Sequence, residues 1–579
     1  MAPAWFPLFA VVCSGGHDDV LVPELAQNVT FERQMASNPA APFGIEFRHV
    51  EDLHGPVSGA GGGSTNGAAH VLTHRASRPR SAFSALDGAA NTTSETPFAA
   101  LAARHGRPLR VAILSDFTRI PYANGAAFQT RFLYQELRRC GHEVTVIGPH
   151  DPDAAPHELA PGTVALPSVP LKTYPGLHLP LPLEKWVFDA KRWDFDVVFA
   201  QTTSFLLEFG VWLRKMRGIP LLCVNTTHLA AAYDVLLPER LAKLGWVNAG
   251  LELTLKRPYE KIFATVYNNS DGLVVLSEGL RSYWRERGVT APIHVIPRAV
   301  QPEIFDKPLG PDPYTHLEGA SDAIWRGSRL LCAGRHTREK QQDRVIRVFA
   351  RHIAPVDREA TLTLLGEGPD TEYYKRVAQE EGVADRVFFP GEVPFTKMPD
   401  FYAYADVFVH ASLSETYGNV MGEALWCGTP TVAFADGMGV SSQIKGGVNG
   451  VLLSPGKGGQ QERDADAAFG RAVLDLLADP QERARLGKAA AKMARERSSP
   501  FAVQTRIADA FRHAQEHAAA SGVRAAVGAP RVVQWMTTFQ HFRSWAAVNG
   551  GVYLVGHIRP APDKGAAKKK SRLHPQIGT

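Results

Sequence analysis

The stretch Ser414-Glu415-Thr416-Tyr417-Gly418-Asn419-Val420-Met421-Gly422-Glu423 comes directly after the apolar run Val407–His410. A short apolar run of this kind predicts a buried strand, and the residues after it predict a loop that turns into a helix. The first turn of such a helix presents unpaired N–H groups and the positive end of the helix dipole. The stretch therefore predicts a binding site for an anion such as a diphosphate.

Two carboxylates flank this predicted helix start. Glu415 and Glu423 are eight residues apart, so they do not share a helix face if Glu415 lies on the loop. Each can then accept hydrogen bonds from a different set of hydroxyl groups. A solvated helix face is the alternative, but the apolar neighbours of Glu423 make an unpaired carboxylate costly there.

Strands and helices alternate in two separate series along the chain. This pattern predicts an α/β protein with two Rossmann-like, doubly wound domains that face a central cleft. The first series of expected strands is Leu109–Leu114, Val144–Ile147, Val197–Phe199, Leu221–Val224 and Gly272–Leu276. The second is Leu330–Cys332, Thr361–Leu365, Val387–Phe389, Val407–His410 and Thr431–Ala433.

The expected domain boundaries follow from these two series. Residues 1–107 are rich in Gly, Ser, Ala and Thr and predict a flexible extension, with a small accessory domain within residues 15–55 as the alternative. The remaining expected segments are a first domain at 108–307, a linker at 308–324, a second domain at 325–505, and C-terminal helices with a basic tail at 506–579.

The composition narrows the class of protein. A net charge of +5 over 579 residues does not suggest a nucleic-acid-binding protein. Five scattered cysteines without a C-x-x-C pattern argue against a disulfide framework or a zinc site and favour a reducing compartment. No apolar run reaches the ~18 residues of a membrane span, and no basic residue precedes the apolar stretch Trp5–Cys13 to form a signal peptide. We expect a cytoplasmic protein that can still contact a membrane.

The central stretch resembles the E-x7-E signature of family 4 of the retaining glycosyltransferases, which have the GT-B fold. Further landmarks follow in the family's order, and the resemblance covers roughly residues 108 to 525. These landmarks are Pro121 with Asn124-Gly125, Gly141-His142-Glu143-Val144, Thr227-His228, Val295–Val300 with Phe305, Gly334-Arg335 with Lys340, Gly366-Glu367-Gly368-Pro369 and Asn449-Gly450.

The resemblance implies a hexosyltransferase that moves a sugar from a UDP- or GDP-linked donor to an acceptor hydroxyl. It assigns Arg335 and Lys340 to the donor diphosphate, Glu415 to the sugar hydroxyls and Glu423 to the ribose diol. His228 would face the transferred sugar. The other implied donor-binding residues are Asn124, Gly125, Gly334, Gly418, Asn419 and Val420.

Each of these assignments has an alternative. The segment from Arg335 to Lys340 taken alone is an exposed charged loop, and a lone histidine such as His228 is more often structural. Gln443 stands where the family usually has a glutamate, which leaves the details of sugar recognition open. No residues have metal-ligand spacing, so neither metal nor another cofactor is expected beside the nucleotide sugar.

The resemblance also implies a mechanism, front-face substitution, in which the departing phosphate accepts the acceptor's proton. The rival hypotheses are a nucleotide-sugar epimerase on a GT-B scaffold and a non-catalytic sugar-nucleotide-binding protein. A phosphorylase would need a lysine for pyridoxal phosphate, which no sequence context suggests.

Two segments bear on the acceptor. Leu166–Pro170 and Leu179–Pro182 resemble family members that glycosylate lipids. Near the C-terminus, an apolar stripe recurs at helical spacing beside Arg531 and Arg543, before the basic cluster Lys568–Arg572. Such a stripe can lie on an anionic bilayer, or it can pack on the protein as a C-terminal helix. Its members are Val532, Trp535, Met536, Phe539, Phe542 and Trp545.

Overall fold

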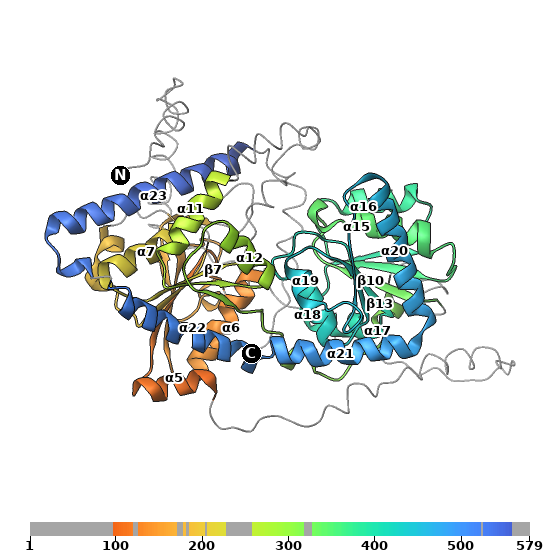
Figure 1. Ribbon diagram of the computed structural model, residues 1–579, viewed down its shortest axis with the longest axis horizontal. Coiled ribbons are helices and arrows are strands. Elements are labelled where there is room, and N and C mark those ends of the chain that lie inside the picture. Colours follow the sequence, from red (N-terminus) through yellow and green to blue (C-terminus); the bar gives the residue numbers. More distant parts are fainter. Residues whose placement is uncertain are drawn as a thin grey trace, which may run out of the picture. The chain divides into compact units, whose positions relative to one another are not determined.

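The computed structural model describes residues 96–119, 125–170, 178–180, 185–202, 205–226, 257–317, 327–522 and 525–558. All of these residues lie in one compact unit, His74–Thr579. They form two larger parallel sheets, one in each half of this unit, with helices packed against both (Figure 1). The doubly wound α/β class predicted from the sequence is confirmed.

The first sheet has the strand order β3-β2-β1-β6-β7-β8-β9, and every neighbouring pair is parallel. Strand β1 pairs with β2 on one side and with β6 on the other, so the winding reverses between β1 and β6. Its strands are β1 (Arg110–Ser115), β2 (Glu143–Pro149), β3 (Val164–Leu166), β6 (Val197–Gln201), β7 (Leu221–Asn225), β8 (Gly272–Val275) and β9 (Ile293–Val295).

Both faces of this sheet are buried, which explains its continuous apolar strands. Along β1, Val111 and Ile113 belong to one apolar core, whereas Ala112 and Leu114 belong to another on the opposite face. The helices of this part of the chain are α5 (Pro97–His105), α6 (Gly125–Arg139), α7 (Phe205–Arg217), α11 (Arg257–Asn268) and α12 (Glu278–Glu286).

Helix α5 corrects the expected N-terminal extension, which was to run to residue 107. Thr96 caps this helix by accepting a hydrogen bond from the Ala99 amide at 3.2 Å. Phe98 and Leu101 are buried in the same core as Val111. The helix has the same alanine-rich composition as the residues before it, so composition alone does not separate the two.

The second sheet has the order β12-β11-β10-β13-β14-β15, again with parallel neighbours only. Here the winding reverses between β10 and β13. Its strands are β10 (Arg329–Ala333), β11 (Thr361–Leu365), β12 (Val387–Gly391), β13 (Val407–His410), β14 (Thr431–Phe434) and β15 (Val451–Leu453). Its helices are α15 (Gln342–Val348), α16 (Thr371–Glu380), α17 (Met398–Tyr404), α18 (Asn419–Trp426), α19 (Gly439–Gln443), α20 (Gly459–Ala478) and α21 (Pro480–Ser498).

The remaining segments connect or extend these layers. A short antiparallel pair joins β4 (Ser168–Pro170) to β5 (His178–Pro180). The short helices are α13 (Pro302–Phe305) and the 3-10 or π turns η1 (Pro156–Glu158), η2 (Lys185–Phe188), η3 (Ala190–Arg192), η5 (Pro313–His316), η6 (Arg338–Lys340), η7 (Phe349–Ile353), η8 (Phe395–Lys397) and η9 (Ala526–Gly528).

Part of the expected linker at 308–324 packs on the second sheet's core. Tyr314 of η5 is buried, and its hydroxyl donates to the Phe401 carbonyl at 3.0 Å. A buried aromatic side chain with a satisfied hydroxyl fixes this segment.

The C-terminal helices return to the first sheet. Helix α21 packs against α18, while α22 (Pro500–Ala520) packs against β7 and β8 (Figure 1). The last helix is α23 (Arg531–Ile558), which packs against α7. None of the described helices is long and apolar enough to cross a bilayer.

Candidate donor site

The loops after β10 and β13 begin at neighbouring strands, where the second sheet reverses its winding. Ligands of doubly wound sheets bind at the carboxyl ends of the strands that flank such a point. The first loop carries Arg335 and Lys340, and the second carries Glu415. The fold therefore brings together two segments that the sequence separates by about 75 residues.

Lys340 and Glu415 form an ion pair, with 2.7 Å between Lys340 Nζ and Glu415 Oε1. The ring of His410, the last residue of β13, lies with its Nε2 3.4 Å from the same carboxylate oxygen. Burial is the largest single influence and acts to raise the pKa of Glu415, but the Lys340 ammonium and the His410 ring together outweigh it and hold that pKa well below its usual range. Glu415 is therefore an ionised acceptor of hydrogen bonds at neutral pH.

Arg335 is exposed at the start of the first loop. Among the described residues its guanidinium has no ion-pair or hydrogen-bond partner. Arg338 in the same loop differs, because it pairs with Asp370 at 3.2 Å and lies over the Tyr373 ring at 3.6 Å. The alternative that this segment is only an exposed charged loop therefore fits Arg338. The N–H donors of Arg335, in contrast, are available for an anion.

The backbone beneath Arg335 is fixed by the neighbouring loop after β11. Gly366 has a φ of 121°, and a Cβ at this position would lie 2.2 Å from the Gly334 carbonyl oxygen. The His336 amide donates to the Glu367 carbonyl at 3.0 Å. These close contacts require glycine at 366 and hold the position from which Arg335 extends.

Helix α18 starts at Asn419, directly after Gly418, whose φ of 79° turns the chain into the helix. No side chain caps this helix, and the structure gives the Asn419 and Val420 amides no partner among the described residues. Two free N–H groups at the positive end of the helix dipole form an anion-binding arrangement. The loop and the helix start that the sequence predicts are present, and binding of an anion there stays a prediction.

Glu423 lies one turn further along α18 and is half-buried. Its Oε2 accepts a hydrogen bond from the Tyr402 hydroxyl at 2.9 Å. Burial raises the pKa of Glu423 to about 7, although the Tyr402 hydrogen bond acts in the opposite direction. Glu415 on the loop and Glu423 on the helix therefore differ in charge state as well as in position.

Gln443 is buried, and its side chain is hydrogen-bonded to the protein backbone. Its amide Nε2 donates to the Tyr417 carbonyl and, at 3.3 Å, to the Gly418 carbonyl. A glutamate here would be unable to donate to either carbonyl when ionised. Gln443 thus holds the turn before α18 and does not offer its amide to sugar hydroxyls.

Polar side chains that the sequence reading missed lie at the carboxyl ends of first-sheet strands. Thr202, just after β6, donates to the Asp116 carboxylate, just after β1, at 2.5 Å. Gln129 of α6 is buried, and neither side-chain polar atom has a hydrogen bond in the described structure. The sequence feature that could have indicated these residues is a pair of polar residues at the end of each apolar run. These pairs are Ser115-Asp116 and Gln201-Thr202.

The remaining predicted residues are less fully described. Gly125 is the first residue of α6, whereas Asn124 and His228 lie outside the described residues. Thr226, two residues before His228 in the chain, accepts a hydrogen bond from Thr416 at 3.0 Å. No group of three or more His, Cys, Asp or Glu that could hold a metal ion occurs among the residues the structure describes.

Fold and site together define a GT-B transferase that uses a nucleotide-linked donor. Residues 123–304 match the family model described as Glycosyltransferase Family 4, and residues 326–493 match the model described as Glycosyl transferases group 1. The chain therefore belongs to family 4 of the retaining glycosyltransferases and is a hexosyltransferase.

Curated relatives agree with this family. The alpha-monoglucosyldiacylglycerol synthase of Streptococcus pneumoniae is 27% identical, over 56% of this chain and 71% of the relative. The GDP-mannose-dependent alpha-(1-6)-phosphatidylinositol monomannoside mannosyltransferase of Mycolicibacterium smegmatis is 29% identical, over 53% and 81%. The D-inositol 3-phosphate glycosyltransferase of Kribbella flavida is 34% identical, over 33% and 45%.

Solved structures agree with the fold. Sucrose-phosphate synthase from Thermosynechococcus elongatus superposes with a TM-score of 0.54 at 21% identity, over 70% of this chain and 98% of that chain. Anabaena HepE superposes with a TM-score of 0.53 at 19% identity, over 69% and 99%. The relatives of Mycolicibacterium smegmatis and Kribbella flavida are named as transferases, which favours a transferase over the epimerase and the non-catalytic binder.

Proposed function

We propose that this glycosyltransferase moves a hexosyl group from a UDP- or GDP-sugar to a hydroxyl of a lipid headgroup at the cytoplasmic face of a membrane. The observation that carries the donor half is the Lys340–Glu415 pair beside the uncapped start of α18. A cation, a carboxylate and free N–H groups in one place match a molecule that joins a diphosphate to a polyol.

Each donor group has a proposed partner. Arg335, Lys340 and the amides from Gly418 to Val420 bind the diphosphate, and Gly334 allows the loop to approach it. Glu415 accepts hydrogen bonds from the sugar hydroxyls. Glu423 accepts them from the ribose diol, whose hydroxyls displace Tyr402 or share the carboxylate with it.

The first domain supplies the opposite side of the donor. Asn124 and Gly125 contact it after β1, and His228 faces the sugar. Support for His228 comes from its neighbour Thr226, which is hydrogen-bonded to the Glu415 loop through Thr416. Asp116 and Thr202 lie at the carboxyl ends of neighbouring strands, next to Ser115. The Asp116 carboxylate is suited to accept hydrogen bonds from an acceptor headgroup, and the Thr202 hydroxyl is suited to donate one to it.

The reaction proceeds by front-face substitution. The bond from the anomeric carbon to the diphosphate oxygen breaks, and the acceptor oxygen bonds to the same face of that carbon. The acceptor's proton passes to the departing phosphate oxygen. Arg335 and Lys340 stabilise the charge that develops on that oxygen, so we expect neither a metal ion nor another cofactor to be required.

The lipid acceptor rests on the relatives and on the C-terminal helix. Two relatives are named for a glycolipid or a phosphatidylinositol mannoside, and the third for inositol phosphate. The cytoplasmic side fits the cysteines, because Cys140, Cys223, Cys332 and Cys427 are all free.

A donor and acceptor panel tests this proposal. UDP-glucose, UDP-galactose, UDP-N-acetylglucosamine and GDP-mannose are each incubated with diacylglycerol, phosphatidylinositol or free inositol phosphate, with and without EDTA. The proposal expects a labelled lipid product with one donor, in the presence of chelator as well. Transfer to free inositol phosphate alone would contradict the lipid acceptor, and loss of transfer in EDTA would contradict metal independence.

A further inference from the structure

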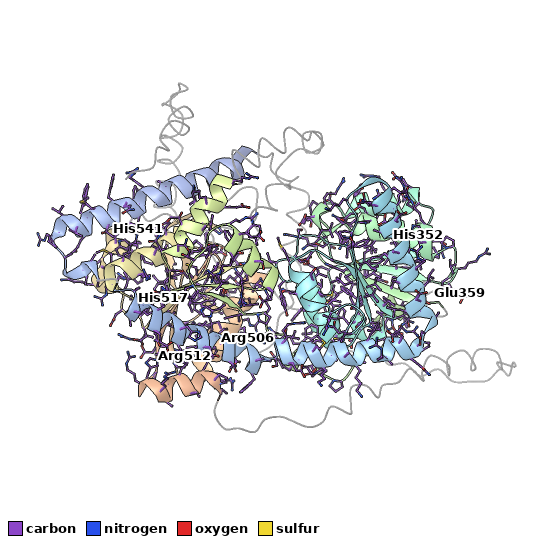
Figure 2. The ribbon with its side chains drawn as sticks, in the orientation of Figure 1. His352, Glu359, Arg506, Arg512, His517 and His541 are labelled. Carbon is purple, nitrogen blue, oxygen red and sulfur yellow. The ribbon has the colours of Figure 1, made fainter. Side chains whose placement is uncertain are left out.

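Helix α23 packs on the protein through its polar side chains. The Trp212 indole N–H of α7 donates to the Thr538 hydroxyl at 3.1 Å, and His541 Nδ1 lies 3.0 Å from Glu208 Oε2, also of α7. The Gln534 amide donates to the Ala529 carbonyl at 2.8 Å. Figure 2 labels His541 on this helix. Residues 534, 538 and 541 share one helix face, so the inward face of α23 is polar from Gln534 to His541, the part whose side chains the structure describes.

The opposite face carries large apolar side chains that are exposed. We call Val532, Trp535, Met536, Phe539 and Phe542 the outward stripe. Trp535 is 64% exposed and Met536 58% exposed. The rings of Trp535 and Phe539 stack with centroids 5.2 Å apart. The packing alternative is thus wrong for these five residues: the helix does lie on the first domain, but its apolar face is turned away.

This orientation is the reverse of an ordinary surface helix, whose apolar stripe faces the core. Contiguous exposed apolar side chains on one element indicate that a further surface covers them. The polar contacts to α7 fix the helix in this orientation. Glu208 and His541 are both buried, so the hydrogen bond between them replaces the hydrogen bonds to water that each loses on burial.

Charge identifies the kind of surface. Residues 531–579 contain four Arg, four Lys and a single Asp, an excess larger than the +5 of the whole chain. Helix α23 itself contains neither Asp nor Glu. Arg531 and Arg543 lie exposed beside the outward stripe. An anionic surface complements this segment, whereas a second copy of the same helix would bring like charges together.

We propose that α23 is the docking helix of this enzyme, with the outward stripe inserted into the interface of an anionic phospholipid bilayer. This inference rests on the proposed lipid acceptor. Apolar insertion and attraction of basic residues to anionic headgroups add to each other, so neither contribution need hold the protein alone. Because α23 is anchored on α7 of the acceptor-side domain, docking would keep that domain at the lipid surface.

Vesicle binding of the full chain without any donor tests the docking helix. Vesicles of phosphatidylcholine alone are compared with vesicles that also contain phosphatidylglycerol, at low and high salt. The W535S/F539S variant is compared with F501S, because Phe501 of α22 is equally an exposed aromatic residue at 50%. We expect W535S/F539S to lose about tenfold or more in affinity for anionic vesicles, and F501S to bind like the wild type.

Two further measurements separate the possible results. A chain that ends at Asp563 lacks the lysine cluster and should bind anionic vesicles less tightly, mainly at low salt. Unchanged binding of W535S/F539S would overturn the proposal, as would light scattering that shows a dimer which this variant converts to a monomer. Transfer to a detergent-dispersed acceptor is assayed separately. If the wild type transfers no sugar to this acceptor, the proposed lipid acceptor is wrong. The vesicle-binding measurement then still tests whether α23 is the docking helix.

Discussion

At the scale of single residues, Lys340 carries the clearest expectation. Its ammonium contacts Glu415, and a donor diphosphate at this position would share it. K340A should lower kcat by about 100-fold, because the charge on the departing phosphate loses a cation. K375A is the matched control, since Lys375 is exposed and pairs with Glu372 one helical turn away on α16. Steady-state kinetics with saturating donor measures the effect, and equal turnover in both variants would contradict the role.

Arg335 and Arg338 form a natural pair for comparison within one loop. Arg335 extends without a partner among the described residues, whereas Arg338 is held by Asp370 and Tyr373. R335A should lower kcat/KM strongly, which corresponds to an increase of roughly 2–4 kcal/mol in the activation free energy. R338A should change kcat/KM little. Similar kcat/KM values for the two variants would mean that Arg335 is only a surface charge.

Glu423 gives an expectation about pH. Folding raises its pKa from 4.5 to about 7, so the folded chain retains a proton that the unfolded chain releases. The stability from this retained proton is complete below pH 4.5 and is lost as the pH rises through 7. E423Q removes this dependence, so the Tm of the variant relative to wild type should increase from about pH 5 to about pH 8.

The same variant separates the roles of the two glutamates. E423Q should mainly weaken binding of plain UDP or GDP, because the amide offers the ribose diol one acceptor oxygen where the carboxyl group offers two. E415Q should mainly impair transfer and sugar choice. A pH-independent Tm difference would contradict the protonation account, and equal losses of nucleotide affinity would contradict the division of roles. Differential scanning calorimetry measures the Tm difference, and isothermal titration calorimetry measures the nucleotide affinities.

Sequence reasoning named candidate residues for the donor site but not their contacts. The spacing and the resemblance singled out Arg335, Lys340, Glu415 and Glu423 as candidates. They did not show that Lys340 contacts Glu415, because that contact depends on how two loops 75 residues apart meet. Tyr402 and His410 were missed for the same reason, since each becomes part of the site only through tertiary packing.

At the scale of elements, Gln443 of α19 positions the turn that precedes α18. Q443E replaces an amide that donates to the Tyr417 and Gly418 carbonyls with a group that repels both when ionised. The variant should bind nucleotide at least tenfold more weakly. Q460E is the control, because Gln460 lies exposed on α20. Nucleotide titration that shows no difference between the two variants would contradict the positioning role.

Elements were predictable in proportion to their length. All ten expected strands are present, with bounds that differ by at most two residues; Thr361–Leu365 and Val407–His410 match as predicted. The strands β3, β9 and β15 have three residues each, too few for an apolar run to stand out. Gly141, two residues after the end of helix α6, has a φ of 82°, which favours glycine.

At the scale of the whole molecule, the chain crosses between the two sheets twice. The two crossing segments are joined where the Val300 amide donates to the Ser498 carbonyl at 2.9 Å. The Tyr417 hydroxyl lies 2.7 Å from the Ser498 hydroxyl, so the loop of Glu415 contacts this junction. The return of α22 to the first sheet was not predicted, because an amphipathic helix alone does not indicate which sheet it covers.

The most direct measurement of the central claim is the anomeric configuration and identity of the product. Wild-type protein is incubated with the accepted sugar nucleotide and lipid, and the extracted product is examined by NMR. We expect nucleoside diphosphate to be released only with acceptor present, and the α-configuration of the donor to be kept in the glycolipid. A new sugar nucleotide formed without acceptor, a β-linked product, or nucleotide binding without turnover would each contradict a retaining lipid glycosyltransferase.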